Sequence, residues 1–351
     1  MTVRSFVYEA LPMRVVFGPG ALGSLRAETE RLGLQRVLVL CTPGQRALAD
    51  RAAALLAERA VGVFAEARMH VPVTTVAAAA RAARAAEADG CAAVGGGSTV
   101  GLAKALALRH GLAVVAVPTT YAGSEMTPIW GLTENARKQT GRDRAVLPRT
   151  VLYDPELTRA LPVPVSVTSG LNAMAHAVEA LYAPDGSPVV AAMAEQGVRD
   201  LAVALPAIAD RPDDLDARAA ALQGAWLCGA CLGATTMGLH HKLCHVLGGL
   251  LDLPHAETHA VMLPYVAAFD LPAAPEARAA LARALGADDP AAALACLAER
   301  LGAPRTLRGL GVRHEDLGRV ADEVLAAPYA NPRPVGRAEL DELLERAWSG
   351  T

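Results

Sequence analysis

The first half of the chain alternates short apolar runs with longer Ala-rich segments in which apolar residues recur at helical spacing. Four apolar runs predict β-strands: 36–41, 61–67, 91–98 and 112–120. The segments 45–58 and 74–88 predict helices between them. After Arg36 the run 36–41, RVLVLC, is apolar at every position, as burial of both faces of a strand requires. This alternation predicts an α/β fold, with a mostly parallel sheet covered by helices.

After Asp154-Pro155 the strand-like runs disappear and helical periodicity continues to the end of the chain. The predicted helices span 166–183, 188–205, 215–239, 241–249, 275–285, 290–301, 314–326 and 337–347. Since 351 residues exceed what one hydrophobic core normally holds, we expect two domains. These are an α/β domain over 1–158 and an all-α domain over 159–351, and a cleft between them is the expected active site.

Charge and hydropathy limit the partners that this chain can bind. Charged residues make up 20% of the sequence and the formal net charge is −3, which gives no basic surface for nucleic acid. The apolar stretch 224–239 carries no charge, is rich in Gly and Ala and is short for a membrane span. The N-terminus lacks the apolar stretch of a signal peptide. We therefore expect a cytoplasmic protein with no membrane or nucleic-acid partner.

The six cysteines are scattered, which favours reduced thiols over a disulfide framework. Cys228 and Cys231 form a C-x-x-C, but no thioredoxin-like strand and turn precede it. We expect this pair to pack within a helix and the other four cysteines to lie in the core.

A glycine turn follows the third predicted strand and opens a helix. Gly95, Gly96, Gly97 and Ser98 stand where backbone N–H groups can approach a pyrophosphate at the positive end of a helix. A tight turn between strand and helix would also use these glycines. The sequence matches neither G-x-G-x-x-G nor a P-loop.

A second polar loop follows the next predicted strand, and together the two loops predict a dinucleotide-binding crevice. Its candidate cofactor residues are Thr119, Thr120, Tyr121 and Ser124, and we add Thr42, at the end of the first strand, and Lys104, one of only three lysines. No acid follows strand 36–41 to hold a ribose 2′-hydroxyl or repel a 2′-phosphate. The expected cofactors are therefore both NADH and NADPH.

Polar residues in the second half repeat at a spacing of four, which places each pair on one helix face. Asn172 and His176 form one pair, His241 and His245 another, and His255 follows as a loop imidazole. Such a set resembles a metal site, but an amide stands where a divalent ion would want a carboxylate. Two further histidines, His240 and His259, fall off this face, so we expect them to be ordinary surface or core residues.

The segments GGGS, PTTYAGSEMTP, SGLNAMAHAVEA and HHKLCHVLGGLLDLPHAETHAVMLP resemble the iron-containing alcohol dehydrogenase family over nearly the whole chain. The resemblance implies a dinucleotide-binding domain, a helical domain and a homodimer. It places the metal-binding Asp of the family at Asn172 and its three metal-binding histidines at His176, His241 and His255. His245 matches a histidine near the metal and the nicotinamide. Gly101 stands where many members carry Asp.

The loss of the only anionic ligand at Asn172 predicts that no metal is tightly bound; if one is, its ligands are His176, His241 and His255. The nearest likeness within the family is to members that reduce the C=C bond of a small unsaturated keto diacid during aromatic-compound degradation. An enolate then forms, which hydrogen-bond donors can stabilise without a metal. His245 is the expected general acid, and the other three histidines are expected to polarise the ketone or hold a carboxylate.

Cations for the substrate carboxylates are expected from Arg144, Lys138 or Arg333, and Lys242 lies between two site histidines in the sequence. Three other functions remain open. One is a metal-dependent alcohol or aldehyde dehydrogenase on the same scaffold. Another is a sugar-phosphate lyase or cyclase of the dehydroquinate synthase kind, and the third is a nucleotide-binding protein without catalysis.

Overall fold

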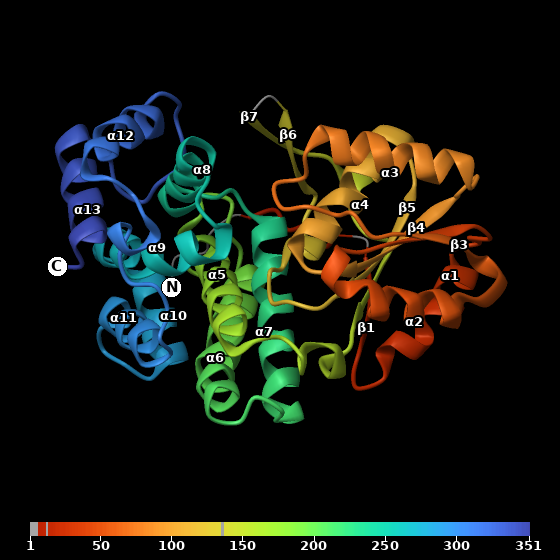
Figure 1. Cartoon of the computed structure of the whole chain (residues 1–351). Coiled ribbons are helices and arrows are strands. Elements are labelled where there is room, and N and C mark those ends of the chain that lie inside the picture. Colours follow the sequence, from red (N-terminus) through yellow and green to blue (C-terminus); the bar gives the residue numbers. More distant parts are fainter. Residues whose placement is uncertain (1–5, 12, 135–136) are drawn as a thin grey trace. The chain divides into compact units, whose positions relative to one another are not determined.

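The computed structural model describes residues 6–11, 13–134 and 137–351. The chain divides into two compact units (Figure 1). One unit is Leu11–Leu161, and the other is Pro162–Thr351 together with the described residues 6–10.

The first unit is built on a six-stranded parallel sheet. In chain order its strands are β1 (Arg14–Phe17), β2 (Val37–Leu40), β3 (Ala60–Phe64), β4 (Gly90–Gly95), β5 (Ala113–Pro118) and β8 (Thr150–Tyr153). They are arranged in the order β1-β8-β5-β4-β2-β3. The predicted α/β class is confirmed, and β2 to β5 are the four predicted strands. The pattern did not reveal β1 and β8.

Helices cover both faces of this sheet, because alternate residues of each buried strand point to opposite sides. Val37, Val39, Ala92 and Val94 pack against α1 (Leu25–Arg31) and α2 (Arg46–Leu56). The intervening positions Leu38, Leu40, Cys91 and Ala93 pack against α3 (Val73–Ala85) and α4 (Gly97–His110). Figure 1 shows the two helix pairs on opposite sides of the strands.

An antiparallel hairpin, which the pattern did not predict, follows β5. Strand β6 (Ile129–Glu134) pairs with β7 (Arg137–Arg142). The sequence of β7, RKQTGR, has no apolar run to mark it as a strand. Gly141 is required there, since a Cβ would lie 2.6 Å from the Trp130 ring.

Short 3₁₀ helices occur in both units, between the longer elements. They span Ala21–Ser24, Pro43–Gln45, Ala57–Arg59, Ser124–Met126, Arg144–Val146, Pro155–Thr158, Leu271–Ala273, Arg308–Leu310 and His314–Asp316.

The second unit is helical. Its helices are α5 (Val163–Tyr182), α6 (Pro188–Asp210), α7 (Leu215–Ala234), α8 (Leu239–Leu251), α9 (His255–Asp270), α10 (Pro275–Leu285), α11 (Pro290–Arg300), α12 (Leu317–Leu325) and α13 (Arg337–Ser349). Helix α5 lies at the centre, is buried from Ser166 to Ala180, and packs against α6, α7 and α9. All the predicted helices are present, with ends shifted by a few residues. Helix α9 was missed, so the expectation that His255 lies in a loop was wrong.

The cysteines are free thiols, and five of them are buried. Cys228 and Cys231 lie within α7, where Gly197 of α6 approaches so closely that a Cβ would lie 2.7 Å from the Cys228 sulfur. This close contact between α6 and α7 agrees with a packing role for the C-x-x-C pair. Cys296 is exposed, which corrects the expectation that every cysteine lies in the core.

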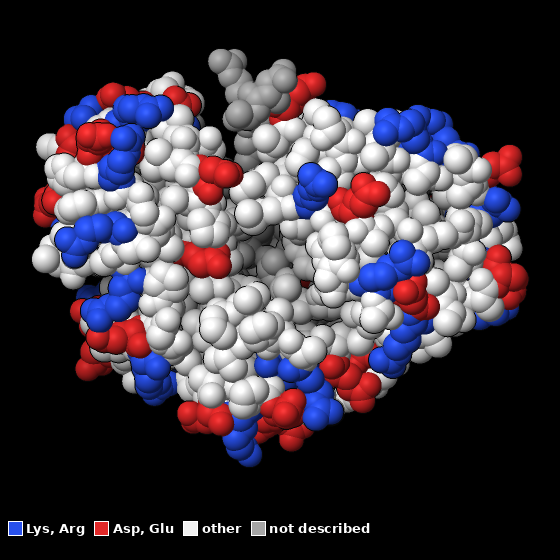
Figure 2. Space-filling view, in the orientation of Figure 1, with Lys and Arg blue, Asp and Glu red and all other residues white. Residues whose placement is uncertain are grey.

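The surface carries both signs of charge. On the face shown in Figure 2, basic and acidic side chains are interspersed. Within the described residues, no helix combines the length and the apolar character needed to cross a bilayer.

A buried lysine holds together the segment after β5. Lys104 of α4 is 1% exposed, and its ammonium donates to the carbonyl oxygens of Ser124 (2.6 Å), Thr127 (2.8 Å) and Ile129 (2.7 Å) and to Thr127 Oγ1 (2.9 Å). Burial lowers the pKa of Lys104 to about 7. The nearby Glu125 is also buried, and Tyr153 donates a 2.7 Å hydrogen bond to it.

Replacing Lys104 with Met should destabilise this unit, because the same volume would then leave several buried oxygens without a donor. We expect a loss of about 2–4 kcal/mol in the free energy of unfolding, measured by urea denaturation. Arg109→Met, at an exposed position of the same helix, is the matched control and should change stability by less than about 0.5 kcal/mol. Equal effects of the two variants would show that the Lys104 contacts do not stabilise the fold.

Candidate functional site

The sheet of the first unit has a switch point at the carboxyl ends of β2 and β4. These strands are neighbours, yet the helices that follow them, α2 and α4, cover opposite faces. The loops that leave the two strands therefore diverge, and parallel α/β sheets bind ligands in the crevice that is expected at such a point. The segments at this expected crevice are Thr42–Gln45 and Gly95–Ser98. The sequence predicted Thr42 and the whole of the second segment.

The three glycines of the Gly95–Ser98 segment have different structural roles. Gly95 has φ +155°, and a Cβ there would lie 2.4 Å from Thr99 Oγ1. A Cβ on Gly96 would lie 2.8 Å from the Thr120 methyl carbon. Gly97 is exposed, and a Cβ on it would meet only Ala122, at 3.8 Å. The first two glycines are thus needed for packing, whereas Gly97 leaves the N-terminus of the 14-residue helix α4 open to a phosphate.

Hydrogen bonds join the loops around this crevice. Gln45 donates from Nε2 to Thr119 Oγ1 at 2.6 Å, and the Thr119 N–H donates to the Gly95 carbonyl at 3.2 Å. The Thr119 hydroxyl is therefore used within the protein, and sequence reasoning missed Gln45. Thr42, Ser98, Thr120 and Ser124 are half-buried around the loops, whereas Tyr121 is fully buried.

Two other positions differ from what the sequence suggested. The ammonium of Lys104 is engaged by the oxygens of the segment after β5, so in this structure Lys104 positions that segment rather than contacting a cofactor. Gly101 is closely packed, since a Cβ there would lie 2.7 Å from a Val71 methyl carbon. The Asp of many family members would not fit at Gly101 without a shift of Val71.

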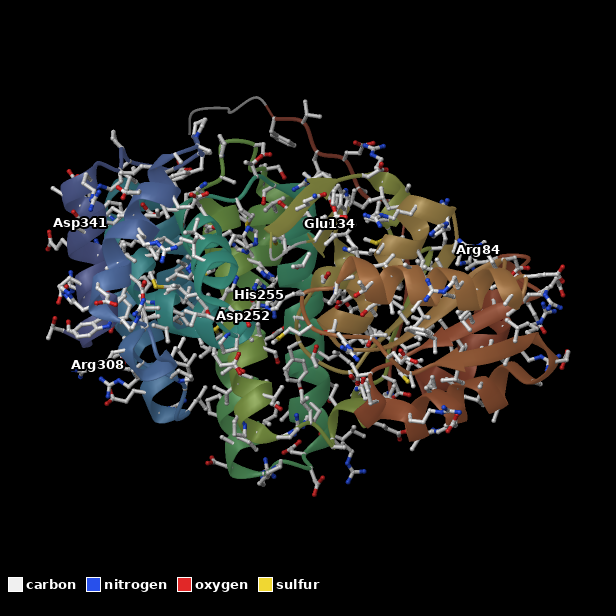
Figure 3. The ribbon with its side chains drawn as sticks, turned by 45° about the horizontal axis from the view of Figure 1, so that its top comes forward. Arg84, Glu134, Asp252, His255, Arg308 and Asp341 are labelled. Carbon is white, nitrogen blue, oxygen red and sulfur yellow. The ribbon has the colours of Figure 1, made fainter. Side chains whose placement is uncertain are left out.

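In the second unit, six imidazoles from three helices form one cluster. Its members are His176 of α5, His240, His241 and His245 of α8, and His255 and His259 of α9. The chain turns from α8 to α9 at Asp252, which adopts the left-handed conformation (φ 53°) just before His255 (Figure 3).

The four histidines that the sequence singled out form a continuous series of ring contacts. The ring centroids lie 5.2 Å apart for His176 and His241, and 6.1 Å apart for His241 and His245. His245 and His255 stack at 6.3 Å with 21° between their planes. His245 and His255 are half-buried whereas His176 and His241 are buried, so the accessible side of the cluster is the side of His245 and His255.

The other two histidines also belong to the cluster, although the sequence placed them off the shared helix face. His259 is fully buried, with its ring 4.4 Å from that of His255 and 5.0 Å from that of His241. His240 Nε2 and His259 Nδ1 share a 2.9 Å hydrogen bond. His259 stands four residues after His255, so recognition of α9 as a helix would have placed both rings on one face.

Several buried polar atoms of the cluster have no hydrogen-bond partner among the described residues. They are Asn172 Oδ1, His176 Nδ1, His240 Nδ1, His241 Nε2 and His259 Nε2. A buried polar atom left unpaired costs about 1–3 kcal/mol, so a polar occupant that reaches these atoms would bind favourably. Asn172 itself is 2% exposed.

Burial keeps the deepest imidazoles uncharged. It lowers the pKa of His241 to about 3 and the pKa values of His176, His240 and His259 well below the usual 6.5. Glu179 of α5 lies against this group and bonds to His241 Nδ1. Burial raises the pKa of Glu179 to about 7, while backbone N–H groups bonded to its oxygens act in the opposite direction.

The donor atoms fit a divalent metal ion poorly. Among the described residues, one trio has donor atoms within 4.8 Å of one another: His240, Cys244 and His259, and not the predicted set. In that trio the two ring nitrogens are hydrogen-bonded to each other at 2.9 Å. The position where a carboxylate would balance the charge of an ion holds the neutral amide of Asn172.

Comparison with known proteins agrees with the two-part organisation. A family model of iron-containing alcohol dehydrogenase matches residues 12–155, and one of the C-terminal part of the Fe-containing alcohol dehydrogenase family matches residues 166–348. The solved structure of 1,3-propanediol oxidoreductase superposes with a TM-score of 0.91 at 28% identity, covering 98% of this chain and 100% of the other.

Higher identities occur among maleylacetate reductases. The maleylacetate reductase of Pseudomonas sp. (strain P51) is 54% identical over 346 residues, which cover 99% of this chain and 98% of the relative. The crystal structure of maleylacetate reductase from Agrobacterium tumefaciens superposes with a TM-score of 0.96 at 52% identity, covering 99% of each chain. With both halves matched by its models, the chain belongs to the iron-containing alcohol dehydrogenase family and is an oxidoreductase.

Proposed function

We propose that this enzyme uses NADH or NADPH to reduce the C=C bond of maleylacetate, giving 3-oxoadipate in the degradation of aromatic compounds. Relatives that are 50–54% identical over nearly their full length carry the name maleylacetate reductase. The observation that carries the proposal in this chain is the cluster of neutral imidazoles with unpaired polar atoms around the Asn172 amide. A polar, electron-poor substrate can use those atoms without a metal ion.

For the cofactor, the proposed site is the crevice at the carboxyl ends of β2 and β4. The N-terminus of α4 would receive the pyrophosphate at Gly97 and Ser98, while Thr42, Thr120 and Ser124 border the crevice. No acid at the end of β2 selects against a 2′-phosphate, so both nicotinamide cofactors remain proposed.

In the proposed reaction, a nicotinamide bound at the first unit would supply hydride to the alkene carbon β to the ketone, and the electron pair of the C=C bond would form an enolate. A general acid of the protein would then protonate the α carbon. His245 is the proposed acid because it is half-buried on the accessible side of the cluster. The buried histidines and Asn172 would orient the ketone and stabilise the charge on its oxygen. The bound nicotinamide supplies only the hydride.

The cations proposed for the substrate carboxylates stand in different places. Arg144 is exposed in the first unit, and Lys242 is half-buried next to His241. Arg333 lies over the Phe269 ring, with the guanidinium carbon 4.2 Å from its centroid. The side chain of Lys138 lies outside the described residues.

We also propose that the enzyme is a cytoplasmic homodimer without a resident metal. A metal-dependent alcohol dehydrogenase is the second candidate, favoured by the family's iron-containing members. Turnover of simple alcohols that disappears on chelation would select it.

The direct test is to follow loss of the NADH absorbance band with purified enzyme and maleylacetate, before and after chelation. We expect oxidation of one NADH per maleylacetate, with chelation leaving the rate unchanged. No consumption of NADH or NADPH with maleylacetate would remove the proposed function.

The variant His245→Ala should lower kcat about 100-fold or more, because a general acid typically contributes that much. The KM for NADH should change less than about threefold, since the imidazole does not hold the cofactor. Steady-state kinetics measure both, and His110→Ala, at an exposed position at the end of α4, is the control. Wild-type turnover in the His245 variant would exclude it as the acid.

Gly97→Ala tests the cofactor crevice. The fold has room for this methyl group, but the group would lie at the open N-terminus of α4, where the phosphate is proposed to bind. We expect a KM for NADH raised about tenfold or more, with the melting temperature little changed. Gly249→Ala, on an exposed turn of α8 with no atom within 4 Å of the new Cβ, should behave as wild type. An unchanged KM for Gly97→Ala would place the pyrophosphate elsewhere.

A further inference from the structure

We propose that Glu179 is a positioning residue that fixes His241 in its Nδ1–H tautomer and leaves the lone pair of Nε2 directed into the imidazole cluster. His241 is then a hydrogen-bond acceptor in the reaction and not a donor to the enolate. The catalytic consequence rests on the proposed function, whereas the tautomer does not.

The contacts of Glu179 are built into the fold. The side chain is 1% exposed and lies on α5 three residues after His176, so both point to the same side of the helix. Its Oε1 accepts the backbone N–H of His240 at 2.7 Å, and its Oε2 accepts that of His241 at 3.3 Å. The same Oε2 is bonded to His241 Nδ1.

These bonds make Glu179 the N-terminal cap of α8, supplied by another helix. The first turn of a helix has backbone N–H groups without intrahelical partners, and a carboxylate there is stabilised by them and by the helix dipole. Gly238, just before α8, permits this approach, because a Cβ there would lie 3.1 Å from Glu179 Oε1. Two backbone N–H groups thus hold the carboxylate in place independently of its bond to the imidazole.

The tautomer follows from this arrangement. The two backbone N–H groups that donate to Glu179 favour its carboxylate form, and above its pKa of about 7 the side chain is ionised and only accepts hydrogen bonds. Under those conditions Nδ1 of the ring is the donor. A neutral imidazole has one N–H, so Nε2 of His241 carries a lone pair. That atom is buried and has no partner among the described residues, and the nearest rings are those of His259 (5.0 Å) and His176 (5.2 Å).

This result changes the role of His241 in the proposed reaction. With its only N–H directed at Glu179, His241 cannot donate to the oxygen of the developing enolate. Its lone pair can instead accept an N–H from a neighbouring imidazole or an O–H from a bound molecule, and so orient that group. Donation to the enolate then falls to the other histidines of the cluster or to Asn172.

A glutamine at position 179 tests this assignment with little change in shape. In Glu179→Gln the amide oxygen can still accept the His240 N–H, but the NH₂ group faces His241 and obliges Nδ1 to accept. The ring proton then moves to Nε2, which gives the opposite tautomer. Asp214→Asn is the matched control, because Asp214 also caps a helix, α7, with a 3.0 Å bond from the Ala217 N–H, and both variants replace a capping carboxylate with an amide.

The decisive measurement is the ¹⁵N chemical shift pattern of histidine-labelled protein on the alkaline side of neutral pH, with His241 assigned from its loss in His241→Gln. We expect Nδ1 of His241 to be protonated and Nε2 to be bare in the wild type and in Asp214→Asn, and the reverse in Glu179→Gln. A wild-type spectrum with the proton on Nε2 overturns the proposal, whether or not any variant folds.

Kinetics supply the second readout. If the tautomer matters in catalysis, Glu179→Gln should lower kcat with maleylacetate about 100-fold or more, with the KM for NADH changed less than about threefold. Asp214→Asn should keep wild-type kcat. Full activity in Glu179→Gln with a reversed tautomer would refute the catalytic part. If the wild type does not reduce maleylacetate, the proposed function fails, and the ¹⁵N pattern still decides the tautomer.

Discussion

The burial of three polar side chains on helix α5 is the constraint on which the candidate site depends. Asn172, His176 and Glu179 lie within a helix buried over most of its length, so their polar atoms can be satisfied only by neighbouring helices or by a bound molecule. Glu179 is satisfied by the start of α8. Asn172 and His176 each have a buried polar atom without a partner among the described residues. Glu179 therefore has a structural role, whereas Asn172 and His176 remain available to a ligand.

The chemistry that such a cluster can perform follows from its charge. Burial disfavours imidazolium, and the amide at position 172 supplies no negative charge to hold a metal ion. A neutral, polar and largely buried cluster suits a reaction in which charge spreads over an enolate, because preorganised dipoles are effective there. The alkoxide of an alcohol dehydrogenase reaction would need a stronger electrophile. The cluster thus favours reduction of a conjugated alkene over oxidation of an alcohol.

Much of this organisation could be predicted from the sequence, and the exceptions have physical reasons. Strands β2, β4 and β5 were predictable because burial on both faces makes their runs largely apolar, and β3 has an apolar run although it lies at the sheet edge. Strand β7 is polar and β1 is a partly buried edge strand, so neither has a clear pattern. Strand β8 was also missed, although it is as short and as buried as β2. Helix α9 was missed because it starts directly after Pro254 and contains Pro264. That omission concealed His259. The contacts of Lys104 and Glu179 depend on segments distant in sequence, and no local pattern reveals them.

The central claim is that the amide at position 172 leaves the imidazoles without a resident ion and free to act on the substrate. The most direct measurement is the divalent metal content per chain of the active wild type and of Asn172→Asp, prepared side by side without chelator. The account predicts far less than one ion per chain in the active wild type and about one in the variant, which should lose turnover with maleylacetate. One tightly held ion per chain in the wild type, with activity lost when it is removed and regained when it is restored, would contradict it.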